Sequence, residues 1–204
     1  MRTLAIDCAT EACSVALFEG EQALASDFRV LGRGHAEHLV PMIAALPGRG
    51  KAQRILVSVG PGSFTGVRIG IATARALAVA WRADVAGYPT LALVAAMAIR
   101  QADADGVTVC MKGGHGEWFV QDFGRNGSAE TDLASLSPEE AATRGARPTV
   151  AGSESRSLAA ALGAGYRAIE LLPDAARAIE LDPSLFTASI APIYGRGPDA
   201  RLPA

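Results

Sequence analysis

A glycine-rich segment near the middle of the sequence has the composition of a ligand-binding loop. Gly60-Pro61-Gly62-Ser63-Phe64-Thr65-Gly66 follows an apolar run and precedes a long helical pattern. Phosphate groups often bind at such a place in α/β proteins, because the N–H groups and dipole of the helix favour an anion. The segment matches neither the Walker pattern nor the dinucleotide fingerprint. Its spacing favours the alternative, a tight strand-to-helix turn with Ser63 or Thr65 as the helix N-cap.

The predicted helix after this loop carries two regular stripes. Arg68, Arg75 and Arg82 recur every seven residues, so they lie within about 40° of one another around the helix axis. Small residues form a second stripe with a repeat of four, at Gly66, Gly70, Ala74 and Ala78. Small side chains let another helix approach closely, and a helix that is apolar over most of its circumference is either buried or shared with a partner. The three arginines must reach water, which favours a partner-binding face, and packing in the chain's own core is the alternative.

Two other combinations of residues could carry chemistry. His35 and His38 could bind zinc with His115 as a third ligand, which would make the chain a hydrolase. A helix cap and a solvated histidine also explain this pair, and we expect no metal. Asp7, Ser63 and His35 could suggest a serine hydrolase, but no nucleophile-elbow motif supports that reaction. We therefore expect no catalytic residue in this chain.

The elements that would position these residues alternate along the first half of the sequence. Hydrophobic periodicity predicts strands at 3–7, 13–19 and 23–29, a helix at 35–46, a buried strand at 55–59, a helix at 65–82, a strand at 85–88 and a helix at 91–100. This order predicts a mixed sheet covered by helices, which is an α/β fold.

A polar stretch at 101–106 is the one candidate for an internal boundary, so we expect domains at 1–102 and 103–204. The second half is less regular. It has a predicted strand pair at 107–111 and 117–123, and helices that begin near Ser137-Pro138 and Ser153.

Composition and charge exclude several classes of protein. With 19 basic and 21 acidic residues the formal net charge is −2, whereas direct binding to nucleic acid needs a concentrated basic surface. Cys8, Cys13 and Cys110 lack metal-ligand spacing and form a poor disulfide framework, which favours the reducing cytoplasm. A strand is predicted at the N-terminus, where a signal peptide would otherwise begin, and the most apolar segment, 67–85, carries three arginines. We therefore expect no membrane association.

Several of these stretches resemble the TsaB (YeaZ) family, the dimerisation subunits of the bacterial tRNA threonylcarbamoyladenosine synthase complex. The similarity lies in residues 4–7, 9–16, 35–43 and 60–80, of which the last stretch is specific. A shorter match at Pro192-Ile193-Tyr194-Gly195-Arg196 stands near the end of the chain. The resemblance is therefore strong over about the first 100 residues and thin afterwards.

The resemblance implies an actin/hexokinase-like (ASKHA) fold of duplicated βββαβα half-domains, the second reduced. It also implies pairing with a catalytic paralogue of the TsaD type through a bundle formed by the helices at 35–46 and 65–82. The paralogue would carry the metal and transfer threonylcarbamoyl to the adenosine beside the anticodon, so that this chain is required but not catalytic. We expect the interface to contain His35, His38, Leu39, Met42, Ile43, Phe64, Gly66, Arg68, Ile69, Gly70, Thr73, Ala74 and Leu77.

The resemblance further implies an ATPase of the TsaE type, tRNA contact only through the complex, and ATP or ADP near the subunit interface. We expect Asp7, Thr10 and Ser63 near such a nucleotide, because actin-like kinases have a carboxylate near phosphate and magnesium where Asp7 stands. An acidic residue at a strand end is also a common turn former. No cofactor of the chain's own is expected. In isolation, the small-residue helix is expected to pair with a second copy as a homodimer.

One segment departs from the family pattern. Where relatives usually show Asp-Ala-Arg before a strand, this chain has Lys112-Gly113-Gly114-His115-Gly116-Glu117-Trp118, which predicts a looser hairpin tip. The alternative function is an actin-like ATPase or kinase, or a metallopeptidase-like hydrolase, that acts on its own. The chain lacks a second phosphate loop of the same Asp-Gly character, which disfavours the ATPase or kinase.

Overall fold

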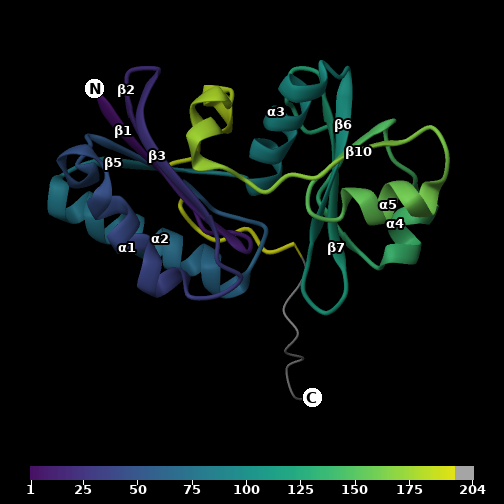
Figure 1. The fold of residues 1–204 in the computed structure, drawn as a ribbon, viewed down its shortest axis with the longest axis horizontal. Helices are drawn as coiled ribbons and strands as arrows, with labels where there is room; N and C mark the ends of the chain where they lie inside the picture. Colours follow the sequence, from purple (N-terminus) through teal and green to yellow (C-terminus); the bar gives the residue numbers. More distant parts are fainter. Residues whose placement is uncertain (196–204) are drawn as a thin grey trace.

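The N-terminal half of the protein follows the predicted order of elements, and the computed structural model describes residues 1–195 (Figure 1). Its elements are β1 (Arg2–Asp7), β2 (Ala12–Glu19), β3 (Gln22–Val30), α1 (His35–Ala45), the 3-10 helix η1 (Pro47–Gly50), β4 (Arg54–Ser58), α2 (Phe64–Trp81), β5 (Asp84–Tyr88) and α3 (Thr90–Ala102). The predicted strands and helices of this half agree with these bounds to within two residues at each end. Hydrophobic periodicity was sufficient here because the three α-helices have 11 to 18 residues and every strand has five or more.

The C-terminal half is built from shorter elements. They are β6 (Gly106–Lys112), β7 (Trp118–Gly124), β8 (Ala134–Leu136), α4 (Pro138–Arg144), β9 (Thr149–Ala151), α5 (Ser155–Leu162) and β10 (Arg167–Ile169), followed by the 3-10 helices η2 (Ala175–Glu180) and η3 (Pro183–Leu185). The predicted start of α4 is confirmed, since Ser137 and Glu140 form a capping box around Pro138. The three-residue strands β8, β9 and β10 were not predicted.

The two halves repeat one sheet topology. The strand order is β3-β2-β1-β4-β5 in the first sheet and β8-β7-β6-β9-β10 in the second. In each sheet the first three strands form an antiparallel meander, and two further strands join parallel to the first. This repetition, with a smaller second sheet, confirms the predicted duplicated actin/hexokinase-like α/β fold.

Two layers of helix cover the first sheet, and one of them is shared with the second sheet. A buried cluster joins β1, β2 and β4 to α1 and α2 on one face. On the other face, side chains of α3 and η2 pack against both sheets, so that α3 lies between them (Figure 1). Because both faces of β1 and β4 are covered, nearly all of their side chains are buried. None of the helices within residues 1–195 has the length and hydropathy needed to cross a bilayer.

The end of the described chain returns from the second sheet to the first. Ala175 donates its N–H to Ser14 Oγ at 2.9 Å, and Gly87 pairs with Thr187 in an isolated bridge. Further along, the Ile193 N–H donates to the Val59 carbonyl at 2.7 Å. The predicted boundary after residue 102 lies between α3 and β6, but residues 175–193 pack on the first half. The division into domains stays a prediction, and Arg196 of the predicted C-terminal match lies outside the described residues.

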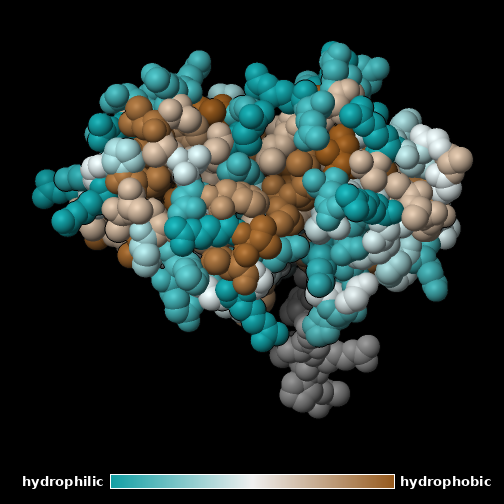
Figure 2. Space-filling view, viewed as in Figure 1, coloured by the Kyte–Doolittle hydropathy of each residue, from teal (hydrophilic) through white to brown (hydrophobic). Residues whose placement is uncertain are grey.

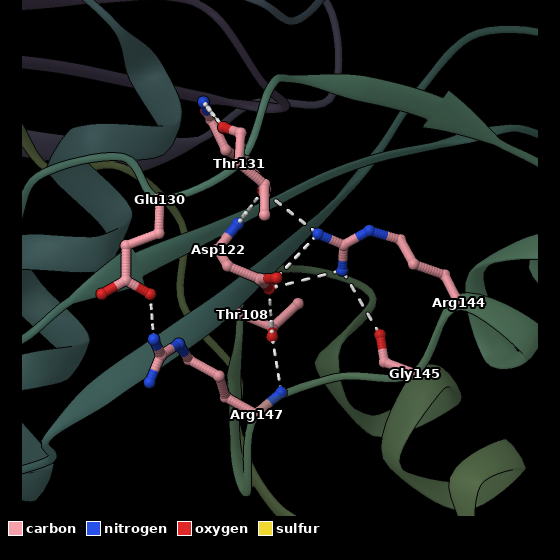
Figure 3. A network of polar contacts seen from close by, with 8 residues as sticks. Thr108, Asp122, Glu130, Thr131, Arg144, Gly145 and Arg147 are labelled. Carbon is pink, nitrogen blue, oxygen red and sulfur yellow. Dashed lines mark hydrogen bonds and ion pairs between the residues drawn. The ribbon is translucent and has the colours of Figure 1, made fainter.

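A polar network holds α4 against β7 in the second half (Figure 3). Arg144 donates to a carboxylate oxygen of Asp122 at 2.7 Å, and the Thr108 hydroxyl donates to the other oxygen at 2.6 Å. The Arg147 N–H donates to the Thr108 hydroxyl at 2.8 Å, and the Arg147 side chain forms an ion pair with Glu130. The network therefore adds polar contacts to the apolar packing of Ala141 from α4 in the core of the second half.

Candidate functional site

The glycine-rich loop is held by its own chain. Ser63 is the N-cap of α2, and its Oγ accepts a hydrogen bond from the Gly66 N–H at 3.2 Å. The Ser63 N–H donates to the Ala9 carbonyl at 2.7 Å. Any Cβ at Gly62 would overlap that carbonyl group, so glycine is required for this close approach. The helix-start interpretation is confirmed, and these two N–H groups already have partners inside the protein.

A cleft of about 780 Å³ lies beside this loop, between the two halves. Its walls are mostly apolar and come from the β1–β2 loop, the start of α2, the β6–β7 hairpin and the returning C-terminal segment. Six of its lining residues are Thr10, Ser63, Arg68, Lys112, Phe119 and Tyr194. The segment that departs from the family pattern therefore contributes to the cleft through the tip of its hairpin.

Arg68 connects the cleft to helix α2. Its guanidinium lies 3.2 Å from the centre of the Phe64 ring and donates to the Tyr194 hydroxyl at 2.7 Å. Arg75 lies two helical turns further along α2 and donates to the Ile190 carbonyl at 3.1 Å. Two arginines of the predicted polar stripe thus hold the returning C-terminal segment against α2.

Asp7 is fully buried and does not line the cleft, unlike Thr10 and Ser63. One carboxylate oxygen accepts the Ala9 N–H at 2.9 Å, and the other accepts the Tyr88 hydroxyl at 3.2 Å. Burial raises the pKa of Asp7 to about 7, against the lowering effect of these hydrogen bonds. Of the three predicted nucleotide contacts, Thr10 and Ser63 line the cleft and Asp7 does not. Binding of a nucleotide there stays a prediction.

The two histidines of α1 point in different directions. His35 is buried and donates from Nε2 to the Ala12 carbonyl at 3.2 Å, which ties the start of α1 to β2. His38 is exposed. Within residues 1–195, no cluster of three or more His, Cys, Asp or Glu side chains has a metal-binding arrangement.

The small-residue stripe of α2 faces the chain's own sheet. Gly66 lies against the Cys8 carbonyl, and Gly70 faces the side chains of Val57 and Ile6. The predicted partner contacts that are buried in the chain's own core are His35, Leu39, Met42, Ile43, Gly66, Gly70 and Ala74. The interface role of these residues stays a prediction, although their side chains pack inside the chain's own core. Helical spacing identified an apolar face, but α1 and α2 are apolar on both faces, so spacing could not tell which face meets the sheet.

The solvent-facing side of α1 and α2 is the surface that sequence reasoning missed. Val40 is 55% exposed and Val79 is 82% exposed, although both are apolar. Together with the alanines around them, they form what we call the outer helix face: Val40, Ala44, Ala72, Ala76, Val79 and Ala80. Among the predicted interface residues, Phe64 and His38 are exposed, and Arg68, Ile69, Thr73 and Leu77 are half-buried. The signal that could have identified the outer helix face is the set of apolar residues Ala72, Ala76 and Val79, on the side of α2 away from Gly66, Gly70 and Ala74.

Comparison with known proteins places this arrangement among close structural relatives. Residues 29–164 match the family model described as "TsaD: tRNA N6-adenosine threonylcarbamoyltransferase". The chain is 36% identical over 148 residues to the TsaB protein of Escherichia coli, a "tRNA threonylcarbamoyladenosine biosynthesis protein", and 33% identical over 114 residues to its Haemophilus influenzae counterpart. These matches cover 68% and 53% of this chain, and 64% and 48% of the two relatives.

Similarity to a solved structure extends over nearly the whole chain. YeaZ from Pseudomonas aeruginosa superposes with a TM-score of 0.79 at 30% identity, over 95% of this chain and 99% of that one. The agreement covers both sheets, including the second half, where the sequence resemblance was thin. With the duplicated fold, the matched family model and these relatives, the chain belongs to the TsaB (YeaZ) family.

Proposed function

We propose that this chain is a non-catalytic subunit in tRNA threonylcarbamoyladenosine biosynthesis. It binds a catalytic paralogue of the TsaD type and supports threonylcarbamoyl transfer to the adenosine beside the anticodon. Family membership supports the pathway, and the match to a TsaD family model supports a shared ancestry with such a partner.

The exposed outer helix face is the observation that carries this proposal. Val40 and Val79 lie on two helices that contact each other, and both are more than half exposed to solvent. The exposed alanines of the same helices leave room for helices of a partner to approach closely. Exposed apolar side chains on two helices in contact are typical of an interaction site. Two partner helices against α1 and α2 would complete a four-helix arrangement.

The burial of Asp7 supports a non-catalytic role for this chain. A carboxylate that binds magnesium or phosphate must reach its ligand, whereas Asp7 is buried under Ala9 and Tyr88. The catalytic group therefore belongs to the partner in our proposal. An ATPase of the TsaE type joins the same cytoplasmic complex, and tRNA contacts this subunit only through it.

We also propose that a nucleotide, ATP or ADP, binds in the cleft between the two halves. Thr10 and Ser63 supply hydroxyl groups to the cleft, and Arg68 and Lys112 supply positive charge. The cleft opens next to the start of α2, so a nucleotide there would lie near the subunit interface. In isolation, we propose that the outer helix face also pairs with a second copy.

Charge placed on the outer helix face tests the proposal. We expect Ala76→Glu to abolish co-purification with the catalytic paralogue and to remove threonylcarbamoyladenosine from tRNA, measured by mass spectrometry of nucleosides. Ala160→Glu is the matched control, because Ala160 is an exposed alanine on helix α5 in the other half. Normal co-purification of Ala76→Glu would overturn the proposed interface, provided that circular dichroism shows both variants folded.

A further inference from the structure

Two of the three cysteines lie against each other at the end of the β1–β2 hairpin. The register pairs Asp7 with Ser14, so Cys8 and Cys13 occupy the next opposite positions. Their Sγ atoms are 3.5 Å apart and share a hydrogen bond. Opposite residues of an antiparallel pair have Cα atoms about 4.5–5.5 Å apart, which lies within the range that a disulfide bridges. The hairpin therefore holds two thiols where a bond between them can form.

The third cysteine provides an internal comparison. Cys8 is 2% exposed, and both Cys13 and Cys110 are 0% exposed, so burial alone does not separate them. Among the described residues, Cys110 has no second thiol beside it. Burial raises the pKa of Cys110 to about 12, which keeps it as an unreactive thiol.

The hydrogen bond between the paired thiols makes them chemically unequal. Donation from Cys8 Sγ to Cys13 Sγ lowers the pKa of Cys13 and raises the pKa of Cys8. Arg29 lies opposite Cys13 on strand β3 and further lowers the pKa of Cys13, while burial opposes both effects. Because the thiolate is the nucleophilic form of cysteine, Cys13 is the attacking sulfur of the pair and Cys8 the resolving one.

We infer that Cys8 and Cys13 form a redox-responsive dithiol, which a hydroperoxide such as hydrogen peroxide oxidises to a disulfide. The Cys13 thiolate attacks one peroxide oxygen and the O–O bond breaks, which leaves a sulfenic acid on Cys13 and releases hydroxide. This hydroxide takes up the proton that Cys13 lost and becomes water. The Cys8 sulfur then attacks the Cys13 sulfur, the S–O bond breaks, and the hydroxyl group leaves with the Cys8 proton as a second water. The two thiols thus supply the two electrons that reduce the peroxide.

The position of the pair in the sheet gives a small oxidant a route. Cys13 belongs to β2, and the neighbouring strand β3 is the edge strand of the first sheet (Figure 1). Most side chains of β3 are exposed or half-buried. A strand with few buried contacts opens locally at a lower free-energy cost than the strands in the centre of the core. Hydrogen peroxide is little larger than water and needs only a small opening.

Oxidation of this pair also reaches the loop that begins α2. An added Cβ at Gly66 would overlap the Cys8 carbonyl, and Gly70 faces the Cys8 side chain. The carbonyl of the next residue, Ala9, accepts the Ser63 N–H at 2.7 Å. Bonded sulfur atoms are about 2 Å apart, so disulfide formation draws Cys8 toward β2 and away from these contacts.

The same movement changes one wall of the cleft. Ala9, Thr10 and Glu11 follow Cys8 directly and line the cleft between the two halves. Figure 2 shows hydrophobic surface near the middle of the view, where the two halves meet in Figure 1. The dithiol therefore connects the redox state of the solution to the shape of the cleft. The inference goes beyond the proposed function and does not rest on it, because disulfide formation needs only this chain.

Peptide mapping of the whole protein tests the disulfide. Trypsin releases Cys8 and Cys13 together in the peptide 3–29, and Cys110 in the peptide 101–112. The folded protein is treated with hydrogen peroxide, quenched with catalase and alkylated with iodoacetamide in urea. We expect the peptide 3–29 to lose two hydrogen atoms and both alkylation sites, and dithiothreitol to restore both. Cys110 should be oxidised at least about tenfold more slowly.

Single variants assign the two sulfurs. Cys8→Ser keeps a hydroxyl donor beside Cys13, so the sulfenic acid should accumulate on Cys13 and react with dimedone. Cys13→Ser removes the attacking sulfur, so Cys8 should stay available for alkylation. If the peptide 3–29 of the folded parent stays fully alkylated, or forms its disulfide only in urea, the inference is wrong. Equal oxidation rates for Cys110 and for the pair would overturn it as well.

Hydrogen exchange of the dithiol and disulfide forms tests the connection to the cleft. We expect amide exchange in residues 62–67 to become about threefold faster or more in the disulfide form, because the acceptor of the Ser63 N–H moves. Exchange in α5, which lies in the other half, should be unchanged and serves as the control. Unchanged exchange in residues 62–67 of a protein that carries the disulfide would contradict the connection.

Discussion

Two glycines on helix α2, one turn apart, should respond in opposite ways to the same substitution. Gly66 and Gly70 both belong to the stripe that faces the sheet, and alanine adds one Cβ atom at each. At Gly70, an added Cβ would lie 3.5 Å from the nearest atom of Val57, 3.7 Å from Cys8 and 3.9 Å from Ile6, which are ordinary van der Waals contacts. At Gly66, the added Cβ would overlap the Cys8 carbonyl oxygen, at a distance well below the 3.0 Å within which real Cβ atoms essentially never approach another atom.

The magnitudes follow from helix propensity and steric overlap. Alanine is more favourable than glycine in a helix interior by about 1 kcal/mol, so Gly70→Ala should raise the free energy of unfolding by about 0.5–1 kcal/mol. Gly66→Ala receives a similar contribution, but the backbone of the β1–β2 loop or of α2 must move. Overpacking of this kind costs typically about 1–3 kcal/mol, so the net effect should be destabilising.

Urea denaturation of both variants beside the parent measures the difference. We expect the Gly70→Ala midpoint to rise and the Gly66→Ala midpoint to fall, with a gap of roughly 2 kcal/mol between the two variants. Equal stability of the two variants, or a Gly70→Ala variant less stable than the parent, would refute the packing of α2 against the sheet described above.

Further predictions concern buried and capping groups. The raised pKa of Asp7, about 7 against a usual 3.8, contributes stability below pH 4 that is lost as pH rises through 7. Asp7→Asn should remove this dependence, so the parent should lose roughly 2–3 kcal/mol relative to the variant between pH 5 and pH 8, measured by urea denaturation at each pH. Arg144→Ala leaves the half-buried Asp122 carboxylate with the Thr108 hydroxyl as its remaining side-chain donor, and should lower the free energy of unfolding by about 1–3 kcal/mol. Arg125→Ala, the control, removes exposed ion pairs and should leave the melting curve unchanged. Ser137→Ala should cost about 1 kcal/mol through loss of the α4 cap, measured by thermal denaturation.

Sequence periodicity predicted the long elements well and the short ones poorly. Helices such as α2, with 18 residues, offer several turns in which an apolar period can be recognised. Strands β8, β9 and β10 have three residues each, fewer than two full alternations. Their pairing is decided by the neighbouring strands, which the local sequence does not describe.

The candidate site was predicted less completely, because its contacts join distant parts of the chain. The arginines of α2 were expected to reach water, and Arg75 and Arg82 are exposed. Spacing gave no sign that Arg68 and Arg75 also bind Tyr194 and Ile190, more than 100 residues away. Asp7 was recognised as an acidic residue at a strand end, yet its burial depends on Tyr88 from β5. Local spacing reveals which residues share a helix face and leaves open what that face will meet.

Binding of the catalytic paralogue, measured by isothermal titration calorimetry, tests most directly whether the outer helix face is the docking surface. Gly70→Ala changes the inner face and should bind with a dissociation constant within about threefold of the parent. Ala76→Glu puts a charge on the outer face and should show no measurable heat of binding. Parent-like affinity for Ala76→Glu, together with loss of binding in a folded Gly70→Ala variant, would contradict the account.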